Sequence, residues 1–104
     1  MQVSSAREFF EGLEGRIDPS KTAGVTASYR FDIDGAGIWR IAVADGATTV
    51  TESADAADCT IRMKEDVLLK LIRGEQNPAT AFMTGKIKVD GDVSLALKLK
   101  ELFF

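Results

Sequence analysis

The spacing of hydrophobic residues changes along the chain from a helical period to a strand period. Within residues 6–13 the apolar side chains recur every three or four positions, as on the buried face of an α-helix. Ser5 and Glu8 occupy the positions of a capping box at the start of this segment. From Val25 onward apolar and polar residues alternate, which is typical of strands with one buried face. This alternation predicts an antiparallel meander with glycine-containing turns, over residues 25–33, 38–44 and 47–51.

The second half of the chain predicts two further strands among three helices. The alternating segment 59–63 predicts a fourth strand, and Asp66 stands where the N-cap of the next helix is expected. The remaining predicted elements are helices over residues 67–73 and 78–84, a short strand over 87–89, and a final helix from Val93 to the C-terminus. The order of elements indicates an α+β fold in a single domain spanning residues 1–104.

The final predicted helix carries more apolar residues than contact with one sheet face requires. Ser94, Lys98 and Glu101 fall on one narrow arc, and nearly all other positions are hydrophobic. A helix that lies on a sheet needs an apolar stripe only about 100° wide. Either the final helix is wedged between other elements of a core, or some of its surface faces a cavity for a hydrophobic ligand. The pattern leaves both interpretations open, because a core and a cavity wall need the same residue types.

Composition and charge exclude several classes of partner and location. The net charge of −3 and the absence of a basic cluster argue against nucleic-acid binding. No segment approaches the roughly 20 apolar residues that span a bilayer, and the N-terminal residues lack a signal-peptide pattern. Cys59 is the only cysteine, so no internal disulfide can form. We therefore expect a soluble protein of the cytoplasm.

Residue types that carry catalysis are scarce in the sequence. Histidine is absent, and Cys59 lies on the apolar side of its predicted strand, as a buried and inert thiol does. The paired aspartates flank predicted turns, where turn formation explains them. Neither a phosphate-binding glycine loop nor a GxSxG motif is present. We expect no catalytic residue, metal site or cofactor; a small hydrolase or acyltransferase that uses an aspartate or Cys59 is the remaining enzymatic alternative.

The second half of the sequence resembles the sterol carrier protein type 2 family. The match is dense over residues 57–102, whereas only the order of elements agrees over residues 1–51. Peroxisomal members end in a targeting tripeptide, whereas this sequence ends in Leu102-Phe103-Phe104, so the resemblance does not imply a peroxisomal location. The residues that carry the resemblance are Ala57-Asp58-Cys59-Thr60-Ile61, Leu68-Leu69, Gly74, Asn77-Pro78, Ala81-Phe82, Gly85-Lys86, Lys88, Gly91, Ala96, Lys98-Leu99 and Leu102.

The resemblance implies both a fold and a function. It implies a five-stranded, mostly antiparallel sheet covered on one face by helices, with a hydrophobic tunnel between them. It further implies nonspecific binding and carriage or presentation of lipids, among them fatty acyl chains, phospholipids and sterols or isoprenoids, without catalysis. The candidate ligand-binding residues are Trp39, Ile41, Leu69, Ile72, Phe82, Met83, Leu95, Leu99, Leu102 and Phe103.

A second interpretation assigns the domain a supporting role. It is then a non-catalytic accessory or dimerisation module for an enzyme that modifies a lipid or a quinone, and an exposed Phe103-Phe104 end forms the contact. Homodimer formation and transient contact with a membrane remain open under both interpretations.

Overall fold

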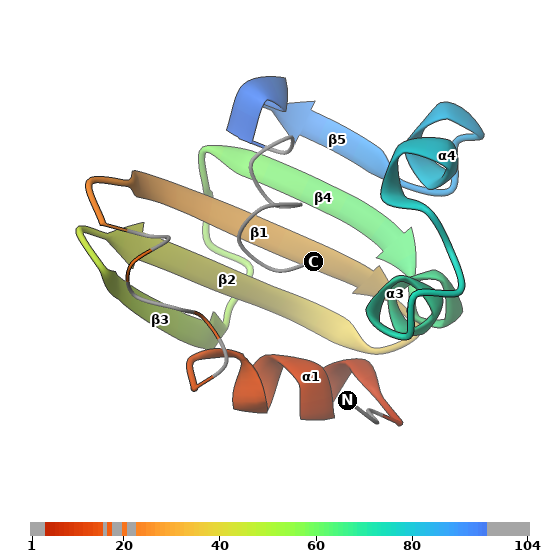
Figure 1. Cartoon of the computed structure of the whole chain (residues 1–104), viewed down its shortest axis with the longest axis horizontal. Helices are drawn as coiled ribbons and strands as arrows, with labels where there is room; N and C mark the ends of the chain where they lie inside the picture. The colour runs from red at the N-terminus through yellow and green to blue at the C-terminus, as the bar shows by residue number, and fades with distance from the viewer. Residues whose placement is uncertain (1–3, 16, 18–19, 21–22, 96–104) are drawn as a thin grey trace.

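The computed structural model describes residues 4–15, 17, 20 and 23–95, which form a five-stranded sheet and short helices (Figure 1). The strands are β1 (Thr26–Asp34), β2 (Gly37–Ala44), β3 (Ala47–Glu52), β4 (Cys59–Lys64) and β5 (Lys88–Gly91). The helices are α1 (Ala6–Leu13), α3 (Glu65–Ile72) and α4 (Pro78–Met83). β1 to β4 lie within one residue of their predicted positions, and β5 ends two residues later than predicted.

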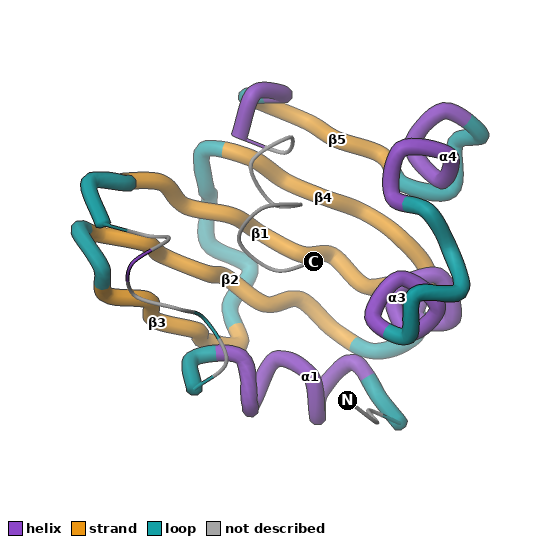
Figure 2. The backbone as a smooth tube through the Cα atoms, in the orientation of Figure 1, coloured by secondary structure: helices purple, strands orange, loops and turns teal. Residues whose placement is uncertain are grey.

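The sheet has the strand order β3-β2-β1-β4-β5. The pairs β1–β2, β2–β3 and β4–β5 are antiparallel, and β1–β4 is parallel. To reach β4, the chain after β3 crosses the polar face of the sheet through residues 53–58 (Figure 2). Arg30 and Arg40 hold this crossing by donating hydrogen bonds to the backbone carbonyls of Ala54 and Ala56, at 3.1 and 3.2 Å. The predicted mostly antiparallel sheet is confirmed.

The opposite, apolar face of the sheet carries the hydrophobic core beneath the helices (Figure 1). Every second residue of β1, β2 and β4 is buried there. Phe10 of α1 stacks on Trp39 of β2, with ring centroids 4.7 Å apart and ring planes 15° apart. The predicted arrangement of helices on one sheet face is therefore confirmed, because strand alternation gives the sheet a single apolar side.

The start of α1 follows the predicted capping box in part. The backbone N–H of Glu8 donates to Ser5 Oγ at 3.2 Å, as expected. The Glu8 carboxylate, however, accepts from the Ser4 hydroxyl at 2.8 Å. A carboxylate from α3 serves the same helix end, since the backbone N–H of Ala6 donates to Glu65 Oε2 at 3.0 Å. This bond ties α1 to α3.

The prediction that Asp66 caps α3 is wrong. The helix begins at Glu65, and its N-cap residue is Lys64, whose side chain makes no capping hydrogen bond. The cause is continuity: β4 runs directly into α3, and Lys64 still pairs with Asp34 in the sheet. Asp66 therefore lies in the first turn, where its negative charge interacts favourably with the helix dipole.

The ends of α4 are formed as predicted. Asn77 Oδ1 accepts hydrogen bonds from the backbone N–H groups of Ala79 and Thr80, at 2.9 and 3.3 Å. Gly85, just past the helix end, has a φ of 79°. Asp92 accepts from the Ser94 backbone N–H at 3.0 Å at the start of a helical turn over residues 93–95. The rest of the predicted final helix lies outside the described residues.

Candidate lipid-binding site

Two of the candidate ligand-binding residues, which would form the wall of the tunnel, belong to the closed core. Trp39 is 3% exposed and Ile41 is fully buried, both on the apolar face of β2. Trp39 is covered by the Phe10 ring on one side, and the Arg7 guanidinium lies 5.8 Å from the indole centroid. Contact between a ligand and these two side chains therefore requires that the packing above the sheet open.

Three further candidates lie at the margin of this core. Leu69 and Ile72 on α3, together with Leu95 after β5, are half-buried and pack against the core cluster. Figure 1 places α3 and α4 at one end of the central strands and residues 93–95 at the other. The margin residues consequently border the apolar sheet face from opposite ends. Leu99, Leu102 and Phe103 lie outside the described residues.

Two further candidate ligand-binding residues, Phe82 and Met83, are exposed on α4. Phe82 is 48% exposed and Met83 is 84% exposed, whereas their neighbour Ala81 is fully buried. Successive helical residues project about 100° apart, so a helix as short as α4 directs only one of three neighbours at the core. Ala81 takes that position, and its carbonyl accepts from the Lys86 backbone N–H at 2.9 Å in the turn that ends the helix. A ligand contact by Phe82 or Met83 remains a prediction.

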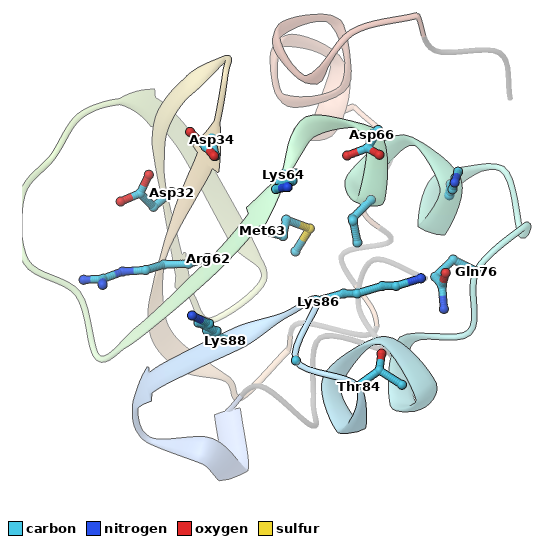
Figure 3. A pocket seen from close by; sticks show the side chains of 13 residues that line it. Asp32, Asp34, Arg62, Met63, Lys64, Asp66, Gln76, Thr84, Lys86 and Lys88 are labelled. Atoms are coloured by element: carbon cyan, nitrogen blue, oxygen red, sulfur yellow. The ribbon is translucent and has the colours of Figure 1, made fainter.

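A surface depression of about 620 Å³ lies where β1 and β4 end, beside α3, α4 and the start of β5 (Figure 3). None of the candidate ligand-binding residues that the structure describes lines it. Its lining includes the apolar side chains of Met63 and Val67, but charged residues predominate: Asp32, Asp34, Arg62, Lys64, Asp66, Lys70, Lys86 and Lys88. Sequence reasoning missed this depression, although the lysines on the polar side of β4 and β5 were its signal.

Burial governs the ionisation of the two titratable groups inside the sheet. Tyr29 and Cys59 are register partners in β1 and β4, and both are fully buried. Burial raises the pKa of the Cys59 thiol and raises the pKa of Tyr29 to about 12. A neutral thiol is a poor nucleophile, so the environment of Cys59 does not activate it. Among the described residues, no group of three or more cysteine, aspartate or glutamate side chains could hold a metal ion.

Comparison with known proteins identifies the family. The model of the SCP-2 sterol transfer family matches residues 9–104. The chain belongs to this family. Sterol carrier protein 2 of Gallus gallus is 41% identical over 95 residues, which cover 86% of this chain and 17% of the relative. The chain thus spans less than a fifth of the length of that relative. The predicted family is confirmed, and with it a lipid-binding or lipid-transfer domain in general terms.

Solved structures share the SCP-2 fold. Palmitated SCP2L2 from Aedes aegypti matches with a TM-score of 0.76 and 23% identity, over 94% of this chain and 93% of that one. The sec-alkylsulfatase Pisa1 from Pseudomonas sp. matches with a TM-score of 0.77 and 20% identity, over 98% of this chain and 19% of the sulfatase. At this level of identity the likeness concerns the fold. Within the described part of the chain, no helix is long and apolar enough to cross a membrane.

Proposed function

We propose that this SCP-2 domain binds lipids nonspecifically and carries or presents them in a hydrophobic tunnel between the apolar sheet face and the helices. Fatty acyl chains and phospholipids are the main proposed ligands, with sterols or isoprenoids as further ones. The proposal rests on one observation above all: the sheet has a continuous apolar face, and its margin carries half-buried or exposed hydrophobic side chains at both ends. Family membership supports the same conclusion.

Burial of the acyl chain supplies enough free energy without any polar recognition motif. About ten buried methylenes at roughly 0.8 kcal/mol each contribute about 8 kcal/mol. This corresponds to a micromolar Kd before the cost of ordering the ligand is subtracted. One methylene more or less changes affinity only modestly, so such a site discriminates weakly between chain types. The tunnel walls are proposed to be the candidate residues given above.

Lipid content and uptake test this function directly. Native mass spectrometry of the purified protein should show bound lipid. Alternatively, a delipidated sample should take up a fluorescent fatty acid, and the bound fatty acid should quench the fluorescence of Trp39, the only tryptophan. A well-folded sample that carries no lipid and takes none up would overturn the proposal.

A pair of matched variants tests the proposed wall. Ile72 and Val50 are both half-buried and packed against the core, but only Ile72 is a proposed wall residue. Ile72→Ser should weaken fatty-acid binding about fivefold, because the loss of roughly 1 kcal/mol of apolar contact has that effect. Val50→Ser should leave the Kd unchanged. Equal effects of the two variants would contradict the assignment of Ile72.

A second candidate function is that of a non-catalytic accessory module for a lipid- or quinone-modifying enzyme. One observation favours it: the matching domain forms only a small part of longer proteins. It covers 17% of the chicken relative and 19% of the sulfatase. Deletion of Phe103-Phe104 separates the two functions. Loss of a dimer or partner with retained lipid uptake favours the accessory role, whereas loss of uptake alone favours carriage. A cytoplasmic location and transient membrane contact are proposed for either role.

A further inference from the structure

The charged depression differs from the rest of the molecule in the sign of its charge. Among the residues that the structure describes, five lysine and arginine residues line it, against three acidic residues. This leaves an excess of two positive charges in a chain whose net charge is −3. The local field, and not the overall charge, decides which ligands a concave site attracts.

The sheet register places like charges opposite each other at this depression. Arg62 on β4 and Lys88 on β5 are directly opposed, an arrangement that costs stability in an antiparallel pair. Asp90 relieves Arg62 through an ion pair at 3.5 Å. The charge of Lys88 has no such relief among the described residues, because its ammonium lies more than 4.0 Å from every described carboxylate oxygen. The opposed pair therefore leaves one uncompensated positive charge at the depression, which a bound anion would compensate.

Three more lysines around the depression share this condition. Within the described part of the chain, no carboxylate oxygen lies within 4.0 Å of the ammonium groups of Lys64, Lys70 or Lys86. The nearby acid Asp32 is already engaged with Arg30 at 4.0 Å. In Figure 3 the Lys86 side chain extends across the depression toward Gln76. Four ammonium groups without a described carboxylate partner therefore line the depression.

The floor of the depression is apolar and belongs to the core. Met63 and Val67 line the depression and are also buried members of the core cluster. Figure 3 shows the Met63 side chain directed into the depression from β4. The depression thus joins a cationic rim to the hydrophobic interior, and its volume of about 620 Å³ is in the range of small-molecule sites.

We propose that this depression binds the phosphate group of an anionic amphiphile, with the phosphate on the lysine rim and the first methylenes of the chain over Met63 and Val67. A phosphate presents up to two negative charges and three acceptor oxygens, and lysine binds it as a point charge. The chain portion of this proposal rests on the proposed lipid carriage, whereas the phosphate portion does not. Head groups are therefore discriminated even though chain types are not.

The test compares amphiphiles with the same acyl chain but different head groups. Lysophosphatidic acid should bind the delipidated protein about tenfold more tightly than the matching monoacylglycerol. Neutralising two rim lysines in K86Q/K88Q should abolish this preference, at roughly threefold per exposed lysine, and leave monoacylglycerol binding unchanged. Ionic strength of about 1 M, where the Debye length is about 3 Å, should reduce the preference in the wild-type protein.

Two control variants fix the sign and the place of the effect. Arg7→Gln removes one positive charge at α1, where Arg7 pairs with Glu52, and should retain the head-group preference. Asp66→Asn removes a negative charge from the depression and should raise the preference about threefold. Circular dichroism and a urea midpoint for each variant exclude loss of folding as the cause. A preference that survives K86Q/K88Q, or that Arg7→Gln abolishes equally, overturns the proposal.

A third arm uses glycerol 3-phosphate, which has no acyl chain, and follows binding by isothermal titration calorimetry. Weak binding to the wild-type protein that is lost in K86Q/K88Q supports the phosphate site even if no amphiphile binds and lipid carriage fails. Binding of lysophosphatidic acid and monoacylglycerol with equal affinity overturns the phosphate site while carriage stands. An absence of binding in every arm overturns both.

Discussion

Replacement of Gly91 by alanine tests the closeness of the β4–β5 pairing that supports both the sheet edge and the following turn. Gly91 pairs with Cys59 and has a φ of 95°, a conformation that side-chain-bearing residues rarely adopt. A Cβ atom at this position would lie 2.5 Å from the Asp58 carbonyl oxygen. Backbone atoms of this pairing would therefore have to move, since a carbonyl cannot rotate away as a long side chain does.

The expected cost has two parts. Alanine at this φ costs about 1–3 kcal/mol of backbone strain. Displacement of the Asp58 carbonyl adds the cost of overpacking, about 1–3 kcal/mol. The displacement also disturbs the Asp92 backbone N–H, which donates to that same carbonyl at 3.1 Å. The free energy of unfolding should therefore fall by about 2–6 kcal/mol, a large share of the total for a small domain.

Gly74→Ala provides the matched control. Gly74 has a similar φ of 76°, but a Cβ there meets no atom within 4 Å. This variant should lose only the strain contribution, about 1–3 kcal/mol. Urea unfolding followed by Trp39 fluorescence measures the stability of both variants. An unchanged m-value shows that a variant changes the stability and not the surface exposed on unfolding. If Gly91→Ala proves no more destabilising than Gly74→Ala, the close approach at Asp58 is wrong.

Three further predictions concern the core, the buried ionisable pair and the cap of α4. Phe10→Ala should lower the free energy of unfolding by about 3–5 kcal/mol through loss of its stack on Trp39, as measured by urea unfolding; a loss below about 1 kcal/mol contradicts this packing. Because folding raises the pKa of Tyr29 from 10.0 to about 12, its contribution to stability is complete below pH 10 and is lost as pH rises toward 12. The urea midpoint should fall across this interval and fall less in Tyr29→Phe, and an identical pH dependence in both proteins refutes the assignment. Asn77→Ala should cost about 1 kcal/mol and speed amide exchange at Thr80, whereas unchanged exchange there argues against the cap.

Local patterns predicted the elements because their causes are local. The alternation that exposes one side of β1 and buries the other is present in residues 25–33 themselves. The limits of α4 follow from Asn77 and Gly85, whose capping roles involve only neighbouring residues. Asp66 shows where this reasoning fails. The sequence predicts Asp66 as a cap because local composition does not reveal that β4 continues directly into α3.

Features formed by distant segments could not be predicted in the same way. The parallel pairing of β1 with β4 joins residues about thirty positions apart, and the polar face that carries the crossing looked simply exposed. The orientation of Phe82 depends on which residue of a one-turn helix faces the core, and Ala81 took that position. The cationic depression is lined by residues from β1, β4, α3, β5 and the segments on either side of α4. Its lysines are far apart in the sequence, and only the fold places them around one depression.

Under the proposed function, the separation between the apolar sheet face and the lysine rim determines how the domain would discriminate between lipids. Free energy from buried methylenes accumulates with chain length and is nearly indifferent to chain identity. Selectivity must therefore come from the polar end of a ligand, where a charge meets either compensating or repelling groups. Met63 and Val67 are the described residues that belong to both environments, since they close the core and line the depression. In the proposed complex the chain and the head group meet at Met63 and Val67, so their contributions to affinity should couple, as contributions from neighbouring contacts do.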